Sequence, residues 1–135
     1  MSELYLVTPA LLQADAFLPV LEQGLDRHQP AALLLRLGEG LAPAAATAII
    51  GAIRPLVQQK GIALMLEDAP ALAVQTGCDG VHLSPSYTAA SVRDVRRQIG
   101  DDVQLGVAVG SSRDGAMRAG EDGADYVCFT PGGAD

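Results

Sequence analysis

The chain has 135 residues, with 9 Lys and Arg against 16 Asp and Glu, and a formal net charge of -7 at pH 7. This acidic balance argues against a nucleic-acid partner or an anionic membrane surface, because both need clustered Lys and Arg. Apolar residues make up 49% of the chain and aromatic ones 4%. We therefore expect one domain over residues 1–135, with an aliphatic core and neither a signal peptide nor a transmembrane helix.

Short apolar runs alternate along the chain with longer amphipathic segments. In chain order they predict strand 4–7, helix 15–27, strand 31–37, helix 43–59, strand 62–66, helix 70–75, strand 80–83, helix 89–99, strand 103–109, helix 114–121 and strand 125–129. We expect Asp15 near the cap of the first helix and Pro55 to kink the second or begin a new segment. Arg93, Arg96 and Arg97 are expected to face water.

Six apolar strands alternating with five helical segments indicate a parallel α/β sheet covered by helices. Two architectures remain open at this point. One is an open doubly wound sheet, which a chain of this length would complete. The other is a βα barrel that lacks its last two units, because a complete barrel typically needs at least ~200 residues.

In parallel α/β folds, chemistry gathers where the strands end. The polar and glycine residues at these ends are Thr8, Arg36, Glu67, Asp68, His82, Ser84, Gly110, Ser111, Ser112, Thr130, Gly132 and Gly133. Arg36 stands among aliphatic residues, so it must be paired or face a wet cavity. It either pairs with Glu67 or Asp68 across neighbouring strands, or captures an anion such as phosphate.

The other strand-end residues also have two interpretations each. Asp68 precedes a predicted helix, so it either caps that helix or, with Glu67, binds Mg²⁺ beside a pyrophosphate. Ser111 precedes the predicted helix 114–121, where it either caps that helix or forms part of a phosphate-binding nest. His82 is expected in the interior with a backbone hydrogen bond, and no second His lies near enough in sequence to suggest zinc. Cys78 and Cys128 are expected to be buried thiols in a cytoplasmic protein.

Several segments together resemble the thiamine phosphate synthase family, which includes the TenI-like proteins. They follow the order and spacing of that family over essentially the whole chain: Leu4-Tyr5-Leu6-Val7-Thr8, Leu33-Leu34-Leu35-Arg36, Leu66-Glu67-Asp68, Gly77-Cys78-Asp79-Gly80-Val81-His82-Leu83 and Gly123-Ala124-Asp125-Tyr126-Val127. The resemblance implies a TIM-type βα barrel rather than an open sheet. It also implies a reaction in which hydroxymethylpyrimidine pyrophosphate is joined to thiazole phosphate, with Mg²⁺ present and pyrophosphate released.

The chain departs from the family pattern at five strand-end positions. In each case the family residue is replaced by another: its Gln by Leu34, its Lys by Gly38, its Asn by Glu67, its metal-binding Asp by Tyr87 and its His by Gly110. The chain thus resembles a divergent member that lacks the last two βα units.

The resemblance assigns a role to five residues. Arg36, Ser111 and Thr130 would bind the pyrophosphate or substrate, and Asp68 with Glu67 would bind the metal; no residue is assigned to catalysis. The expected partners are phosphorylated pyrimidine and thiazole molecules. Two alternatives remain: a non-catalytic protein that binds a thiamine precursor, or a barrel fragment that hides its strand edges by self-association.

Overall fold

The computed structural model describes residues 5–85, 87, 89–109 and 113–128. Strands and helices alternate throughout, as the sequence predicts. They are β1 Tyr5–Val7, α1 Leu18–His28, β2 Ala32–Leu35, α2 Pro43–Gln59, β3 Ala63–Glu67, α3 Pro70–Thr76, β4 Gly80–Leu83, α4 Val92–Ile99, β5 Gln104–Ala108, α5 Arg113–Glu121 and β6 Tyr126–Cys128. No helix among these described residues is long and apolar enough to cross a membrane.

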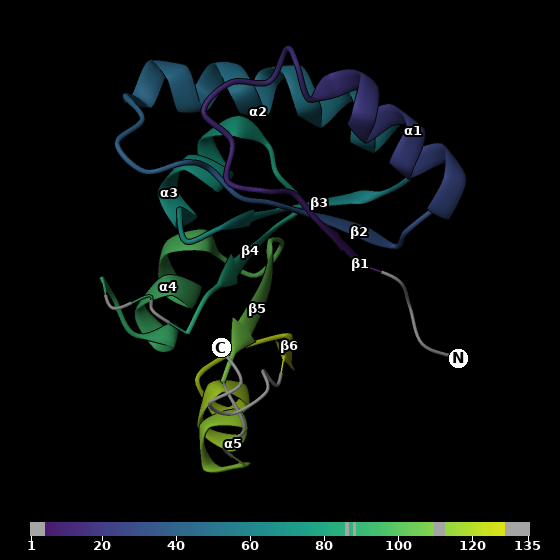
Figure 1. Ribbon diagram of the computed structural model, residues 1–135. Coiled ribbons are helices and arrows are strands. Elements are labelled where there is room, and N and C mark those ends of the chain that lie inside the picture. The colour runs from purple at the N-terminus through teal and green to yellow at the C-terminus, as the bar shows by residue number, and fades with distance from the viewer. Residues whose placement is uncertain (1–4, 86, 88, 110–112, 129–135) are drawn as a thin grey trace.

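The strands form one parallel sheet in the order β1-β2-β3-β4-β5-β6. A doubly wound sheet reverses its strand order at a switch point and carries helices on both faces. Here the order never reverses, and Figure 1 shows the helices following one another around the outer face of a curled sheet. The structure therefore confirms the barrel-type fold and excludes the doubly wound sheet.

The core lies between this outer face and the helices. Alternate strand residues point toward the helices and are 0–1% exposed: Leu33, Leu35, Leu64, Leu66, Val81 and Leu105. Helix α2 packs against them with Ile50, Ile53 and Val57, each fully buried. Burying one such side chain contributes about 1.5–3 kcal/mol, so aliphatic contacts alone suffice for a core with few aromatics.

Two aspartates tie consecutive strands together at the start of β4 and of β6. The backbone N–H of Asp79 donates to the Leu64 carbonyl over 2.9 Å, and its carboxylate accepts from the N–H of the same leucine over 2.8 Å. Asp125 does the same with Leu105, at 2.7 and 2.8 Å. We call each of these reciprocal pairs an aspartate brace. The first joins β3 and β4, and the second joins β5 and β6.

Arg96 reinforces the second brace, so the prediction that it faces water is wrong. Its guanidinium donates to the carbonyls of Gly123, Gly100 and Val103 and to the Asp125 carboxylate, and its side chain is only 16% exposed. Gly100 and Val103 lie between α4 and β5, and Gly123 lies between α5 and β6. A guanidinium carries enough N–H donors to bond all three carbonyls as well as the carboxylate.

Some element boundaries also differ from the prediction. Helix α1 begins at Leu18, because the carbonyl of Ala14 accepts from Phe17 and Leu18 in a preceding turn that contains Asp15. Helix α4 begins at Val92 rather than at residue 89. Ser91 is its N-cap, and its hydroxyl accepts from the Asp94 N–H.

Helix α2 runs through Pro55 from Pro43 to Gln59, so Pro55 begins no new segment. A proline inside a helix costs one backbone hydrogen bond. The buried Ile53 and Val57 on either side of it hold α2 against the sheet, and this burial outweighs the loss.

Candidate functional site

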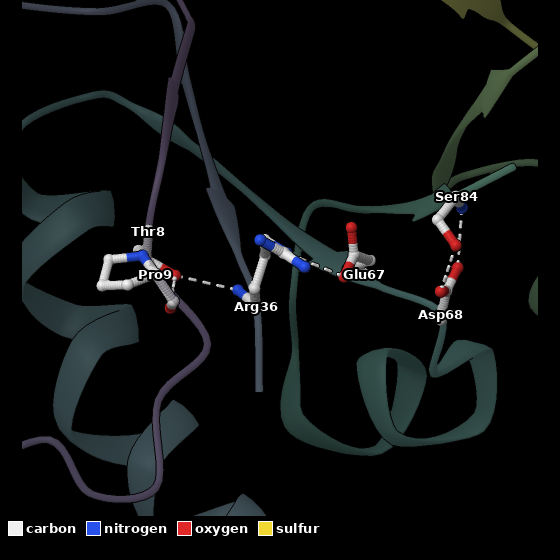
Figure 2. A network of polar contacts seen from close by, with 6 residues as sticks. All are labelled: Thr8, Pro9, Arg36, Glu67, Asp68 and Ser84. Atoms are coloured by element: carbon white, nitrogen blue, oxygen red, sulfur yellow. Dashed lines mark hydrogen bonds and ion pairs between the residues drawn. The ribbon is translucent and has the colours of Figure 1, made fainter. Parts of the chain in front are cut away.

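The carboxyl ends of β1 and β2 are joined by Thr8. This residue is 2% exposed, and its hydroxyl accepts from the Arg36 backbone N–H over 3.0 Å while donating to the Pro9 carbonyl over 2.8 Å (Figure 2). A buried hydroxyl that uses both its donor and an acceptor is fixed in place. Thr8 therefore anchors the backbone from which the Arg36 side chain projects.

Arg36 and Glu67 form an ion pair across the ends of β2 and β3. The Arg36 Nε lies 3.1 Å from the Glu67 Oε1, with 45% of the arginine side chain and 19% of the glutamate side chain exposed. This confirms the pairing interpretation of Arg36. A pair this exposed contributes only about 0–1 kcal/mol, so a ligand of suitable charge can replace either partner.

Asp68 does not cap the helix that follows it. Its φ is 59°, in the left-handed region, which turns the carboxylate away from α3 and toward β4. There Oδ1 accepts from the Ser84 N–H over 2.7 Å and Oδ2 from the Ser84 hydroxyl over 2.6 Å (Figure 2). Helix α3 instead has Ala69 at its N-cap and no side-chain cap. The cap interpretation of Asp68 is therefore wrong.

His82 contacts a tyrosine two strands away rather than the backbone acceptor that we expected. Its Nδ1 lies 3.3 Å from the Tyr126 hydroxyl, and the two rings stack with centroids 6.1 Å apart. Gly106 on the intervening strand makes room, because a Cβ there would lie 2.1 Å from the Tyr126 ring. Burial lowers the pKa of His82, against the opposing charges of Glu67 and Asp68, so its imidazole is neutral near pH 7.

These side chains form one polar row on the sheet face that the helices leave uncovered. The strand register places Glu67 beside His82, His82 beside Gly106 and Gly106 beside Tyr126. Arg36 continues the row, because it follows Leu35, whose register partner Leu66 precedes Glu67. The structure thus brings Arg36, Glu67 and His82 together at the strand ends.

Sequence reasoning missed Tyr126 as a member of this row. The available signal was the small residue Gly106 at the middle strand, which leaves space for an aromatic ring from the strand beside it. Ser111 and Thr130, the other two predicted anion-binding residues, lie outside the described residues. Their predicted role therefore stays a prediction.

The donor set at this edge suits Mg²⁺ in its usual protein setting. No group of three or more His, Cys, Asp or Glu side chains is placed to hold a metal ion within the described part of the chain. Mg²⁺ is commonly held by one or two carboxylates, with phosphate oxygens and water completing its shell. Glu67, which pairs with Arg36, and Asp68, the next residue, provide two such carboxylates, which fits this arrangement and not a cage made by protein alone.

A hollow lies at the opposite end of the sheet. It has a volume of about 540 Å³ and is lined by residues that follow α1 and α2 or start the next strands: Gln29, Pro30, Lys60, Gly61 and Ile62, with Leu25 and Asp26. Barrel enzymes carry their chemistry at the carboxyl ends of the strands. We therefore place the candidate site at the polar row and not in this hollow.

Comparisons with known proteins agree with the fold. A thiamine-phosphate synthase from Rhodospirillum centenum is 44% identical over 126 residues, which cover 93% of this chain and 59% of that protein. One from Hyphomonas neptunium is 39% identical over 132 residues, covering 95% and 59%. A solved thiamine phosphate pyrophosphorylase from Pyrococcus furiosus shares the fold, with a TM-score of 0.80 at 21% identity over 96% of this chain and 60% of that one.

The chain thus spans less than two thirds of the length of these relatives. A family model described as thiamine monophosphate synthase matches residues 4–132, nearly the whole of the sequence. The chain belongs to the thiamine monophosphate synthase family.

Proposed function

We propose that this chain provides the pyrophosphate-binding part of a thiamine-phosphate synthase active site. The reaction joins hydroxymethylpyrimidine pyrophosphate to thiazole phosphate and releases pyrophosphate. The observation that carries the proposal is the ion pair of Arg36 with Glu67 at neighbouring strand ends, with Asp68 next in sequence. One guanidinium and two carboxylates are the groups needed to hold a pyrophosphate together with a divalent cation.

Arg36 is proposed to stabilise the leaving pyrophosphate. Negative charge gathers on this group as its bond to the pyrimidine methylene breaks, and a fixed guanidinium lowers the barrier to that step. Thr8 holds the backbone of Arg36 in place, so the charge is positioned before the reaction begins. Mg²⁺, when bound, would neutralise further phosphate charge, with Glu67 and Asp68 as its protein ligands.

Asp68 and His82 have supporting roles in this proposal. Ser84 fixes both oxygens of the Asp68 carboxylate, which orients their remaining lone pairs for a cation. His82 is neutral and held by Tyr126, so it lines the site without adding charge. A dissociative reaction of this kind needs a dry, charge-stabilising pocket more than a general base.

We further propose that residues 1–135 correspond to the first six of eight βα units, and that Ser111 and Thr130 contribute to phosphate binding. Self-association of the chain along its sheet edges is also proposed, because β1 and β6 each have one neighbour in the described sheet. A cytoplasmic location is supported by Cys78, a buried free thiol of the kind that reducing compartments preserve.

The proposed function predicts that Arg36→Ala lowers kcat/KM for thiamine phosphate formation by about 10²–10³-fold, the usual effect of removing one charge-stabilising donor. The measurement is product formation from the two phosphorylated precursors with Mg²⁺ present. Arg93→Ala is the matched control, because Arg93 also forms an exposed ion pair, with Asp122 at 2.9 Å, but on α4. If Arg36→Ala forms product as fast as Arg93→Ala, Arg36 does not stabilise the leaving pyrophosphate and the proposal is wrong.

A further inference from the structure

The ion pair between Arg36 and Glu67 places a constraint on anion binding. The Nε edge of the guanidinium already donates to Glu67 over 3.1 Å. Thr8 holds the Arg36 backbone over 3.0 Å, so the arginine cannot leave by shifting its main chain. A phosphate-type anion that binds through this Nε edge must compete with Glu67, and the negative charge of Glu67 also opposes an anion that approaches the other N–H donors of the same guanidinium.

We propose that Glu67 acts as a latch on Arg36: it occupies the guanidinium when the site is empty and releases it when a divalent cation binds the Glu67 carboxylate. Metal and pyrophosphate then bind with positive cooperativity, because the metal removes the competitor of the anion. This inference rests on the function proposed above for the same site. It assigns Glu67 the coupling of metal binding to anion binding, which differs from the role of a plain metal ligand.

The neighbouring carboxylate distinguishes a latch from a general charge effect. Asp68 is also a carboxylate and is adjacent in sequence, but both of its oxygens accept from Ser84, and the contacts that the structure shows for Asp68 do not include Arg36. Glu67 exposes 19% of its side chain, so a cation can reach it from solvent. Of these two carboxylates, Glu67 is therefore the one placed to compete with an anion for Arg36.

The test is calorimetric titration of the 135-residue chain with inorganic pyrophosphate, with and without Mg²⁺. Without metal, Glu67→Gln should bind pyrophosphate at least ~10-fold more tightly than the wild type, because a neutral amide holds Arg36 weakly. Adding Mg²⁺ should tighten binding more in the wild type than in Glu67→Gln. Complex formation between Mg²⁺ and pyrophosphate in solution affects both proteins equally, so it cancels when the two are compared.

Glu39→Gln is the matched control, because it removes one negative charge from an exposed position three residues beyond Arg36. It should bind pyrophosphate within about twofold of the wild type, as expected for a screened surface charge. Glu67→Asp serves if thermal melting shows that Glu67→Gln is unfolded. It keeps the charge, shortens the reach to Arg36 and should bind more tightly than the wild type in the absence of metal.

Two outcomes overturn the latch in distinguishable ways. If Glu67→Gln binds no more tightly than Glu39→Gln without metal, while wild type with Mg²⁺ binds and Arg36→Ala does not, the anion site stands and the latch is wrong. If the wild type with Mg²⁺ and every variant fail to bind pyrophosphate, the anion site of the proposed function fails and the latch fails with it.

Discussion

His82 is a half-buried residue whose ionisation depends on the packing around it. Its imidazole stacks on Tyr126 and approaches the tyrosine hydroxyl across the glycine of the strand between them. Burial lowers the pKa of the ring, and the nearby carboxylates of Glu67 and Asp68 offset this only in part. The folded chain therefore binds a proton at His82 less readily than the unfolded chain does.

This difference predicts a pH dependence of stability. His82 contributes stability that is fully present above the unfolded pKa of 6.5 and is lost as pH falls toward and through the lower folded pKa. We expect the urea midpoint of the wild type to fall between about pH 7.5 and about pH 5.5, where carboxylates stay largely ionised. His82→Gln should flatten this slope, whereas substitution of the exposed His28 should preserve it. A His82→Gln slope equal to that of the wild type would show that the ring carries no such linkage.

At the scale of a single element, the packing of strand β5 against Tyr126 depends on Gly106. A Cβ at Gly106 would lie 2.1 Å from the Tyr126 ring, so the ring must move if the glycine is replaced. Moving it also removes the hydroxyl from His82, two strands away. Register, ring position and the polar row are thus coupled through a position that has no side chain of its own.

Gly106→Ala should lower the free energy of unfolding by about 1–3 kcal/mol, the usual cost of overpacking. Gly51→Ala in α2 is the matched control: a Cβ there meets nothing within 4 Å. It should raise stability by about 0.5–1 kcal/mol, because alanine loses less conformational freedom in a helix. Urea denaturation of both variants measures the difference, and equal midpoints would mean that Tyr126 does not rest on this glycine.

The sequence predicts the order of elements well and their partners less well. Alternating apolar runs suffice for six strands and five helices, and the pairing of Arg36 with Glu67 follows from two neighbouring strand ends. The contact of His82 with Tyr126 could not be predicted in this way, because it joins strands that are not adjacent and requires the register of all three. The contact of Asp68 with Ser84 depends on a left-handed φ, which an aspartate adopts only when its surroundings select it.

At the scale of the whole molecule, the β1 side of the sheet presents apolar surface. A groove of about 210 Å³ lies along β1 and α1, lined mainly by Leu6, Val7, Phe17, Val20, Leu21 and Leu33. Val7 and Val20 are 58% and 60% exposed. An uncovered strand edge beside apolar side chains favours association with another chain.

The proposed self-association predicts that the sedimentation coefficient of this chain rises with protein concentration. Val20→Glu should shift the population toward monomer, because a charge buried in an apolar contact loses its hydration. Val74→Glu is the control, since this side chain is 46% exposed on α3, which packs on β3 and β4 and away from both edges of the sheet. A strictly monomeric wild type at all concentrations would rule out this association.

The two aspartate braces have a consequence for the way the chain folds. Each brace joins groups only 15 or 20 residues apart, and every strand pairs with its neighbours in sequence. Loop closure over such short separations costs little entropy, so β3 with β4 and β5 with β6 can form as local units before the sheet is complete. A protein assembled from such units can gain or lose a unit at one end, because the contacts within each remaining unit do not depend on the unit that changes.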